Sequence, residues 1–105
     1  MIHMSKNDDA KGWYLGPWNS NIEIPIGFAN RGIREEHVHR RMNEIYLIAR
    51  GTSTLVIDNK QIALKEGDII VVEPNEIHMF KDSSEDYLHF VIHTPFSKDD
   101  KELIT

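Results

Sequence analysis

Short β-type runs separated by turn residues make up most of the chain. From residue 22 to residue 94, β-branched and aromatic residues alternate with Gly, Pro, Asn and Asp. We expect strands at 22–26, 44–49, 52–57, 61–64, 69–72, 77–81 and 87–93. No long segment shows the 3.6-residue periodicity of an amphipathic helix. Many short strands at close spacing are typical of a sandwich or barrel, so we predict an all-β fold.

Three of these runs carry more specific signals. Pro25 lacks an N–H donor, which favours an edge strand at 22–26. Asp58 and Asn59 tolerate the left-handed turn conformation and predict a hairpin between 52–57 and 61–64. The run Ile69 to Val72 is entirely apolar and is interpreted as a strand buried on both faces.

The length of 105 residues fits one domain, 1–105, with a barrel core at 22–94, an N-terminal arm at 1–21 and a C-terminal tail at 95–105. The net charge of -5 argues against binding nucleic acid or an anionic membrane. The chain has no cysteine, which excludes disulfides and thiolate metal ligands. Because no apolar run could span a bilayer or serve as a leader, we expect a cytoplasmic protein.

Histidines and one glutamate form the most informative pattern. His37 and His39 are two residues apart, so in an extended chain both imidazoles point to the same face. Glu44 can return on the next strand, and His78 follows the 69–72 run and its turn. Three imidazoles and a carboxylate suit a borderline divalent ion such as Fe, Mn, Ni, Zn or Cu. An ordinary hydrogen-bonded histidine pair is the alternative, and the added Glu44 and His78 favour a metal site.

The same residues resemble the cupin superfamily. His37-Val38-His39, Glu44 and Gly51 are similar to the first cupin motif, G(x)5HxH(x)3-4E(x)6G. Gly67, Pro74 and His78 are similar to the second motif, G(x)5PxG(x)2H(x)3N. The resemblance covers residues 22–94, with the short segment between the motifs that small single-domain cupins have.

The chain departs from these motifs at four positions, none of which is a metal-ligand position. In the first motif, the place of the first glycine is occupied by Arg31, and Gly32 comes one residue later. In the second motif, the places of the proline, glycine and asparagine are occupied by Glu73, Asn75 and Asp82, and Pro74 lies one residue after the proline place. Asparagine is a mild replacement for glycine because it also accepts positive φ.

The resemblance implies a fold and a site. It implies a six- to eight-stranded antiparallel barrel of jelly-roll type, or double-stranded β-helix, which is usually dimeric. One metal ion would lie in the barrel mouth, bound by His37, His39, Glu44 and His78. A five- or six-coordinate ion would then have one or two positions open for water, dioxygen or a chelating substrate.

Strand alternation suggests which residues line the pocket. Tyr46 shares a face with Glu44, and Phe80 shares a face with His78, so both are candidate pocket walls; barrel filling is the favoured alternative for Phe80. Arg41 lies in the turn after His39, where it could meet an anionic substrate, although a solvated arginine is the simpler interpretation.

The last expected strand has two different faces. Tyr87, His89, Val91 and His93 share one face, and Leu88, Phe90 and Ile92 share the other. We expect the apolar face to be the core, which would leave His89 and His93 outside or at an interface and not as ligands. Trp13 and Trp18 could cap the barrel mouth or, as we prefer, pack on a partner subunit.

Three functions remain open. The favoured one is a metal-dependent enzyme of dioxygenase or isomerase type, acting on a small chelating molecule. The second is a module that binds or senses a small ligand in the same metal pocket without turnover. The third, a metal-free structural barrel, is disfavoured by the complete set of potential ligands. We expect a small-molecule partner and a homodimer.

Overall fold

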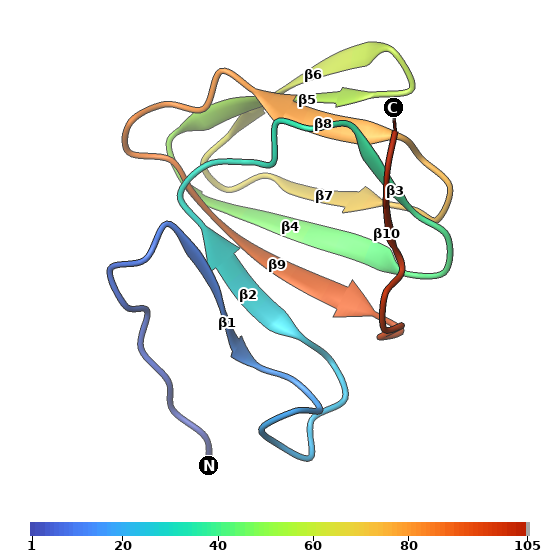
Figure 1. The fold of residues 1–105 in the computed structure, drawn as a ribbon. Coiled ribbons are helices and arrows are strands. Elements are labelled where there is room, and N and C mark those ends of the chain that lie inside the picture. The colour runs from blue at the N-terminus through green and yellow to red at the C-terminus, as the bar shows by residue number, and fades with distance from the viewer. Residues whose placement is uncertain (105) are drawn as a thin grey trace.

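The computed structural model describes residues 1–104, and its secondary structure consists of ten strands (Figure 1). In chain order they are β1 (Lys11–Leu15), β2 (Ile26–Ala29), β3 (His37–His39), β4 (Asn43–Arg50), β5 (Thr52–Ile57), β6 (Lys60–Lys65), β7 (Ile69–Val72), β8 (His78–Lys81), β9 (Leu88–Thr94) and β10 (Lys101–Leu103). Residues 1–104 contain no helix of the length and apolarity needed to cross a membrane. The all-β prediction is confirmed.

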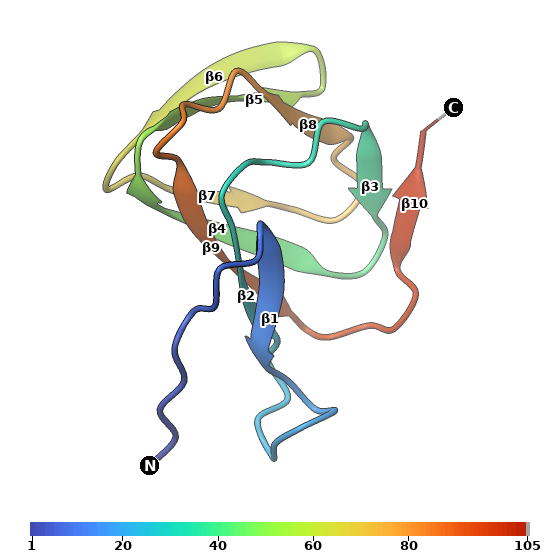
Figure 2. The same ribbon diagram turned by 60° about the vertical axis from the view of Figure 1, so that its left-hand side comes forward.

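The strands form two five-stranded antiparallel sheets that face each other (Figures 1 and 2). The first sheet has the order β1-β2-β9-β4-β7, and the second has the order β10-β3-β8-β5-β6. Apolar side chains from both sheets fill one end of the space between them, including Tyr46 and Ile48 of β4, Leu55 of β5 and Phe80 of β8. The other end holds His37, His39, His78 and His93, whereas His89 packs against Tyr46 and Phe80 of the apolar end.

The hairpin prediction is confirmed. Strands β5 and β6 pair along their whole length, and the turn residues Asp58 and Asn59 have φ values of 48° and 66°. Asn75, which occupies a glycine place of the second motif, has a φ of 72°. These positive angles are the reason that Asn and Asp are suitable at these turns.

Two strand predictions were wrong. The strand expected at 22–26 begins only at Ile26, and it is an inner strand because β1 pairs with its outer side. The strand β7 is not buried on both faces: it is the edge of the first sheet, with Ile69 67% and Val71 46% exposed. An uninterrupted apolar run therefore did not distinguish an edge strand from a central one.

The strands β1 and β10 lie outside the predicted barrel core and were not expected. Strand β1 pairs with β2, and β10 pairs with β3, so both ends of the chain extend the sheets. The C-terminal segment also holds the turn after β3. The buried carboxylate of Asp100 accepts hydrogen bonds from the backbone N–H groups of Arg40, Arg41 and Met42, each at 3.0 Å.

We predict that Asp100→Ala lowers the free energy of unfolding by about 2 kcal/mol, because it removes a charged acceptor from three N–H donors. Burial would raise the pKa of Asp100, but these three hydrogen bonds outweigh it and lower the pKa. The stabilisation should therefore be complete above about pH 5 and be lost progressively as the pH falls below this.

Urea denaturation at pH 7 and at pH 3 measures both effects. Asp8→Ala, at an exposed position, is the matched control and should change stability by less than about 0.5 kcal/mol. Equal stability of the Asp100→Ala and Asp8→Ala variants at pH 7 would contradict a stabilising role of the three hydrogen bonds to Asp100.

Candidate metal centre

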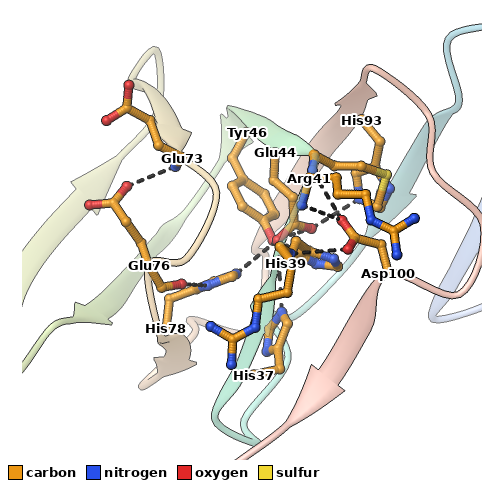
Figure 3. Close-up of polar contacts among 12 residues, drawn as sticks. His37, His39, Arg41, Glu44, Tyr46, Glu73, Glu76, His78, His93 and Asp100 are labelled. Carbon is orange, nitrogen blue, oxygen red and sulfur yellow. Dashed lines mark hydrogen bonds and ion pairs between the residues drawn. The ribbon is translucent and has the colours of Figure 1, made fainter.

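The four predicted ligands come together from both sheets. His37 and His39 lie on β3, and His78 lies on β8, where it is the direct partner of His37. Glu44 reaches them from β4 in the opposite sheet. All four residues are buried, and one potential ligand atom of each lies within 4.8 Å of the others. We call these four residues the Glu44 cluster (Figure 3).

The oxygen Oε1 of Glu44 is the centre of the cluster. It lies 2.8 Å from Nε2 of His78, 2.9 Å from Nε2 of His39 and 3.8 Å from Nε2 of His37. The three imidazoles thus present the same ring nitrogen to one carboxylate oxygen.

Hydrogen bonds to the main chain set the orientation of two imidazoles. Nδ1 of His37 lies 2.9 Å from the carbonyl of Glu35, and Nδ1 of His78 lies 2.9 Å from the carbonyl of Glu76. A carbonyl only accepts, so both Nδ1 atoms carry the proton. A neutral ring of this tautomer would present the lone pair of Nε2 to a bound cation. Without an ion, the 2.8 Å contact of Nε2 of His78 with Oε1 of Glu44 is a hydrogen bond only if Nε2 also carries a proton, because a carboxylate only accepts.

The donor set fits a divalent cation. Nε2 of His37 is buried and has no hydrogen-bond partner among the described residues. A buried polar atom without a partner is costly, and a cation between the imidazole lone pairs and Oε1 of Glu44 would satisfy all of them. Nitrogen and carboxylate oxygen donors suit borderline transition ions better than Ca²⁺ or Mg²⁺.

The second carboxylate oxygen is fixed from the other side. Oε2 of Glu44 accepts a hydrogen bond from the hydroxyl of Tyr46 at 2.9 Å and lies 3.0 Å from Nε2 of His93. Burial raises the pKa of Tyr46 well above its ordinary value, and the neighbouring Glu44 raises it further, so the phenol stays protonated. Such partners orient a ligand and tune its basicity.

The charge of Glu44 is stabilised where it lies. Burial alone would raise the pKa of Glu44, but the imidazoles around the carboxylate, with Nε2 of His39, His78 and His93 within 3.0 Å of it, outweigh burial and hold the pKa well below its ordinary range. The carboxylate is therefore ionised across the physiological pH range.

The prediction for the last strand was wrong. The face with Tyr87, His89 and Val91 is buried, and His93 reaches Glu44 instead of lying outside. Of the three residues expected in the core, Leu88 is buried, but Phe90 and Ile92 are partly exposed. The alternation of the strand was correctly identified, but hydropathy selected the wrong face. The inner face is polar because it borders a cavity.

The cavity between the sheets has a volume of about 530 Å³. Residues of the Glu44 cluster line one part of it, together with Tyr46 and His93. Phe80 lies in the apolar core and is not part of the cavity wall, as the barrel-filling interpretation held. Arg41 is also outside the wall: it is exposed, and its guanidinium donates a hydrogen bond to Ser97 at 3.0 Å.

The two tryptophans lie at the surface beside this site. Trp13 is 47% exposed and contacts His93 edge-on, with ring centroids 4.9 Å apart. Trp18 is 53% exposed and packs edge-on against Trp13. Trp13 also lines the cavity, so it borders the barrel mouth while half of its surface stays available for a partner.

Comparison with known families identifies the fold. The sequence pattern of the Cupin_2 family, described as a cupin domain, matches residues 27–94. The chain belongs to this cupin family. An uncharacterized protein of Methanocaldococcus jannaschii, MJ1618, is 29% identical to the cupin chain over 70 residues, which are 65% of this chain and 56% of that protein. The chain thus matches little more than half the length of this curated relative.

Solved cupin structures have the same architecture at low sequence identity. A cupin-like protein of Thermotoga maritima has a TM-score of 0.73 at 19% identity, over 90% of this chain and 74% of that chain. KdgF of Halomonas sp. has a TM-score of 0.68 at 16% identity, over 92% and 90%. A variant of Streptomyces Pac13 with uridine has a TM-score of 0.70 at 15% identity, over 99% and 92%. These similarities show the fold alone.

We predict that His37 and His78 carry their protons on Nδ1 in the metal-free protein, and that these protons exchange slowly with solvent because both rings are buried. Proton–nitrogen correlation spectra of ¹⁵N-labelled imidazoles measure this directly. His3, an exposed histidine of the N-terminal arm, serves as the internal control and should exchange rapidly. Detection of either ring with its only proton on Nε2 would show that its Nδ1 does not donate to the main-chain carbonyl of Glu35 or Glu76.

Proposed function

We propose that this cupin is a metal-dependent enzyme of dioxygenase or isomerase type. One divalent transition ion would be held by His37, His39, Glu44 and His78, and a small chelating molecule would bind beside it in the cavity. The observation that carries the proposal is the buried, unpartnered Nε2 of His37, turned toward Glu44 by the hydrogen bond of its own Nδ1.

A bound ion would supply Lewis acidity or redox chemistry at the open coordination positions. The residues around it have separate roles. Tyr46 and His93 hold the second oxygen of Glu44, so that Oε1 stays directed at the histidines. The two sheets exclude bulk water from the buried cluster, which strengthens the electrostatic interactions inside. The cavity leaves room for a small molecule next to the cluster.

The alternative is a module that binds or senses a small ligand without turnover. Both functions use the same cluster and cavity. One structural neighbour, Pac13, is described as a nucleoside dehydratase, and this supports the hypothesis that the chain is an enzyme. That similarity concerns the fold, so turnover has to be tested on this chain.

We also propose that the protein acts as a cytoplasmic homodimer. The exposed faces of Trp13, Trp18 and Phe96 support a partner contact, since so much aromatic surface is costly to leave in water. The net charge of -5 supports a small-molecule partner rather than nucleic acid or an anionic membrane.

We predict that the purified protein holds about one divalent transition ion per chain, and that His37→Ala/His78→Ala holds almost none, because two of the four ligands are lost. Elemental analysis after dialysis against a mixture of Fe, Mn, Ni, Zn and Cu salts measures the content. His3→Ala is the control and should keep the wild-type content. Negligible metal in the wild type, or equal metal in all three proteins, would refute the site.

We predict that the metal-loaded protein turns over a small chelating substrate. The dioxygenase hypothesis is tested by loading the protein with Fe(II) under anaerobic conditions and then measuring oxygen uptake with catechols, diketones and thiols. The isomerase hypothesis is tested in parallel by screening for isomerisation of sugar phosphates. Turnover that is absent from His37→Ala/His78→Ala supports the enzyme. Saturable binding without turnover would instead favour the ligand-binding module.

A further inference from the structure

The cavity continues beyond the Glu44 cluster along the inner face of the first sheet. Pairing of β4 with β9 sets Glu44 opposite His93, Tyr46 opposite Val91, and Ile48 opposite His89. Side chains of directly paired residues share a face, so these pairs form three successive rows on the cavity side. His89 lies in the row farthest from Glu44, and we call this part of the cavity the His89 end.

His89 is a buried donor at this end. The side chain is 4% exposed, lines the cavity and packs edge-on against Tyr46, with ring centroids 4.9 Å apart. Burial lowers the pKa of His89 to about 4, although the charge of Glu44 acts in the opposite direction, so the ring is neutral at pH 7.

The neighbouring tyrosine determines which nitrogen of His89 carries the proton. The hydroxyl of Tyr87 lies 2.6 Å from Nδ1 of His89, and both side chains are buried. Burial raises the pKa of Tyr87, so the phenol keeps its proton and needs an acceptor. Nδ1 of His89 is the only acceptor that the described residues give it. The proton of the neutral imidazole is therefore on Nε2, which has no hydrogen-bond partner within residues 1–104.

Positive charge gathers at the same end. Lys11 of β1 pairs with Ala29 of β2, and Ala29 pairs with His89, so the three residues lie in one row across the sheet. Arg31 follows two residues after Ala29, and all four line the cavity. Within the described part of the chain, neither Lys11 nor Arg31 has an ion pair.

Apart from Glu44, which lies two rows away, the acidic residues of the cavity wall belong to a different segment. Asp99 and Asp100 precede β10, which pairs with β3 beside His39. The carboxylate of Asp100 is already occupied by three backbone N–H groups. The His89 end therefore combines a buried neutral N–H donor with two cations, and this combination suits a negatively charged oxygen group.

We propose that the His89 end is a subsite for an oxyanion, a carboxylate or a phosphate group, of the small molecule that the cavity binds. Nε2–H of His89 donates to the oxyanion, and Lys11 and Arg31 neutralise its charge. The inference deepens the proposed function by giving the ligand two ends, one that chelates at the Glu44 cluster and one that is anionic. Only the chelating end rests on the proposed metal site.

The test follows the ring signals of His89 in ¹⁵N-labelled, metal-free protein at pH 7 and constant ionic strength. The probes are inorganic phosphate and acetate, with acetamide as the uncharged counterpart of acetate. We expect a saturable shift of the Nε2–H signal with at least one anion, and the stronger of the two identifies the preferred group. Acetamide should produce at least tenfold weaker binding.

Charge variants distinguish anion binding at the His89 end from a non-specific attraction of anions to positive charge elsewhere on the protein. Lys11→Gln/Arg31→Gln, which changes two exposed side chains, should weaken anion binding by about tenfold, or about 1.4 kcal/mol. Lys60→Gln, on the β5–β6 hairpin, should leave it unchanged. Tyr87→Phe should bind the anion more weakly than wild type, because His89 then loses the partner that selects its tautomer.

The subsite is refuted if neither anion shifts His89 saturably, if acetamide binds as well as acetate, or if Lys60→Gln weakens binding as much as the double variant does. Because the protein is metal-free here, these outcomes are independent of the metal content of the Glu44 cluster. Either proposal can therefore fail while the other holds.

Discussion

The buried carboxylate of Glu44 is the interaction on which the site depends. It joins the two sheets, since Glu44 belongs to β4 of the first sheet and contacts His39 and His78 on β3 and β8 of the second (Figure 3). A carboxylate buried without partners would be strongly unfavourable, and here every side of it is occupied. One oxygen faces three imidazoles, and the other is held by Tyr46 and His93.

The position of this carboxylate depends in turn on parts of the chain far from it in sequence. The turn between β3 and β4 sets how Glu44 lies relative to His39, and the carboxylate of Asp100 fixes that turn through three backbone N–H groups. The C-terminal segment therefore supports the site although it supplies none of the potential ligands. A cavity lined at one end by the Glu44 cluster and at the other by His89 is the result.

The sequence predicted the features that depend on local spacing. The two-residue separation of His37 and His39 is enough to place both imidazoles on one face, and Asp58-Asn59 is enough to specify a hairpin turn. The residue pattern also proposed Glu44 and His78, the resemblance to cupins supported all four as ligands, and the structure brings them to the same place. Whether a metal binds there remains a prediction.

What the sequence did not predict depends on tertiary partners. The alternation of residues divides β9 into two faces. The hydropathy of these faces predicted Phe90 in the core, but in the structure it is His89 that faces inward, toward the cavity. The outer face can be apolar because Tyr14 of β1 packs against Phe28 and Phe90 there. The strands β1 and β10 are short and acquire their structure by pairing with β2 and β3, so nothing in their own residues indicated them.

The most direct test of the central claim is anomalous diffraction from crystals of the metal-loaded protein, recorded at the absorption edge of the ion. We predict one anomalous peak per chain, at about 2.0–2.2 Å from Nε2 of His37, His39 and His78 and from a carboxylate oxygen of Glu44. No peak inside the cavity, or a peak whose ligands exclude Glu44, would contradict this prediction.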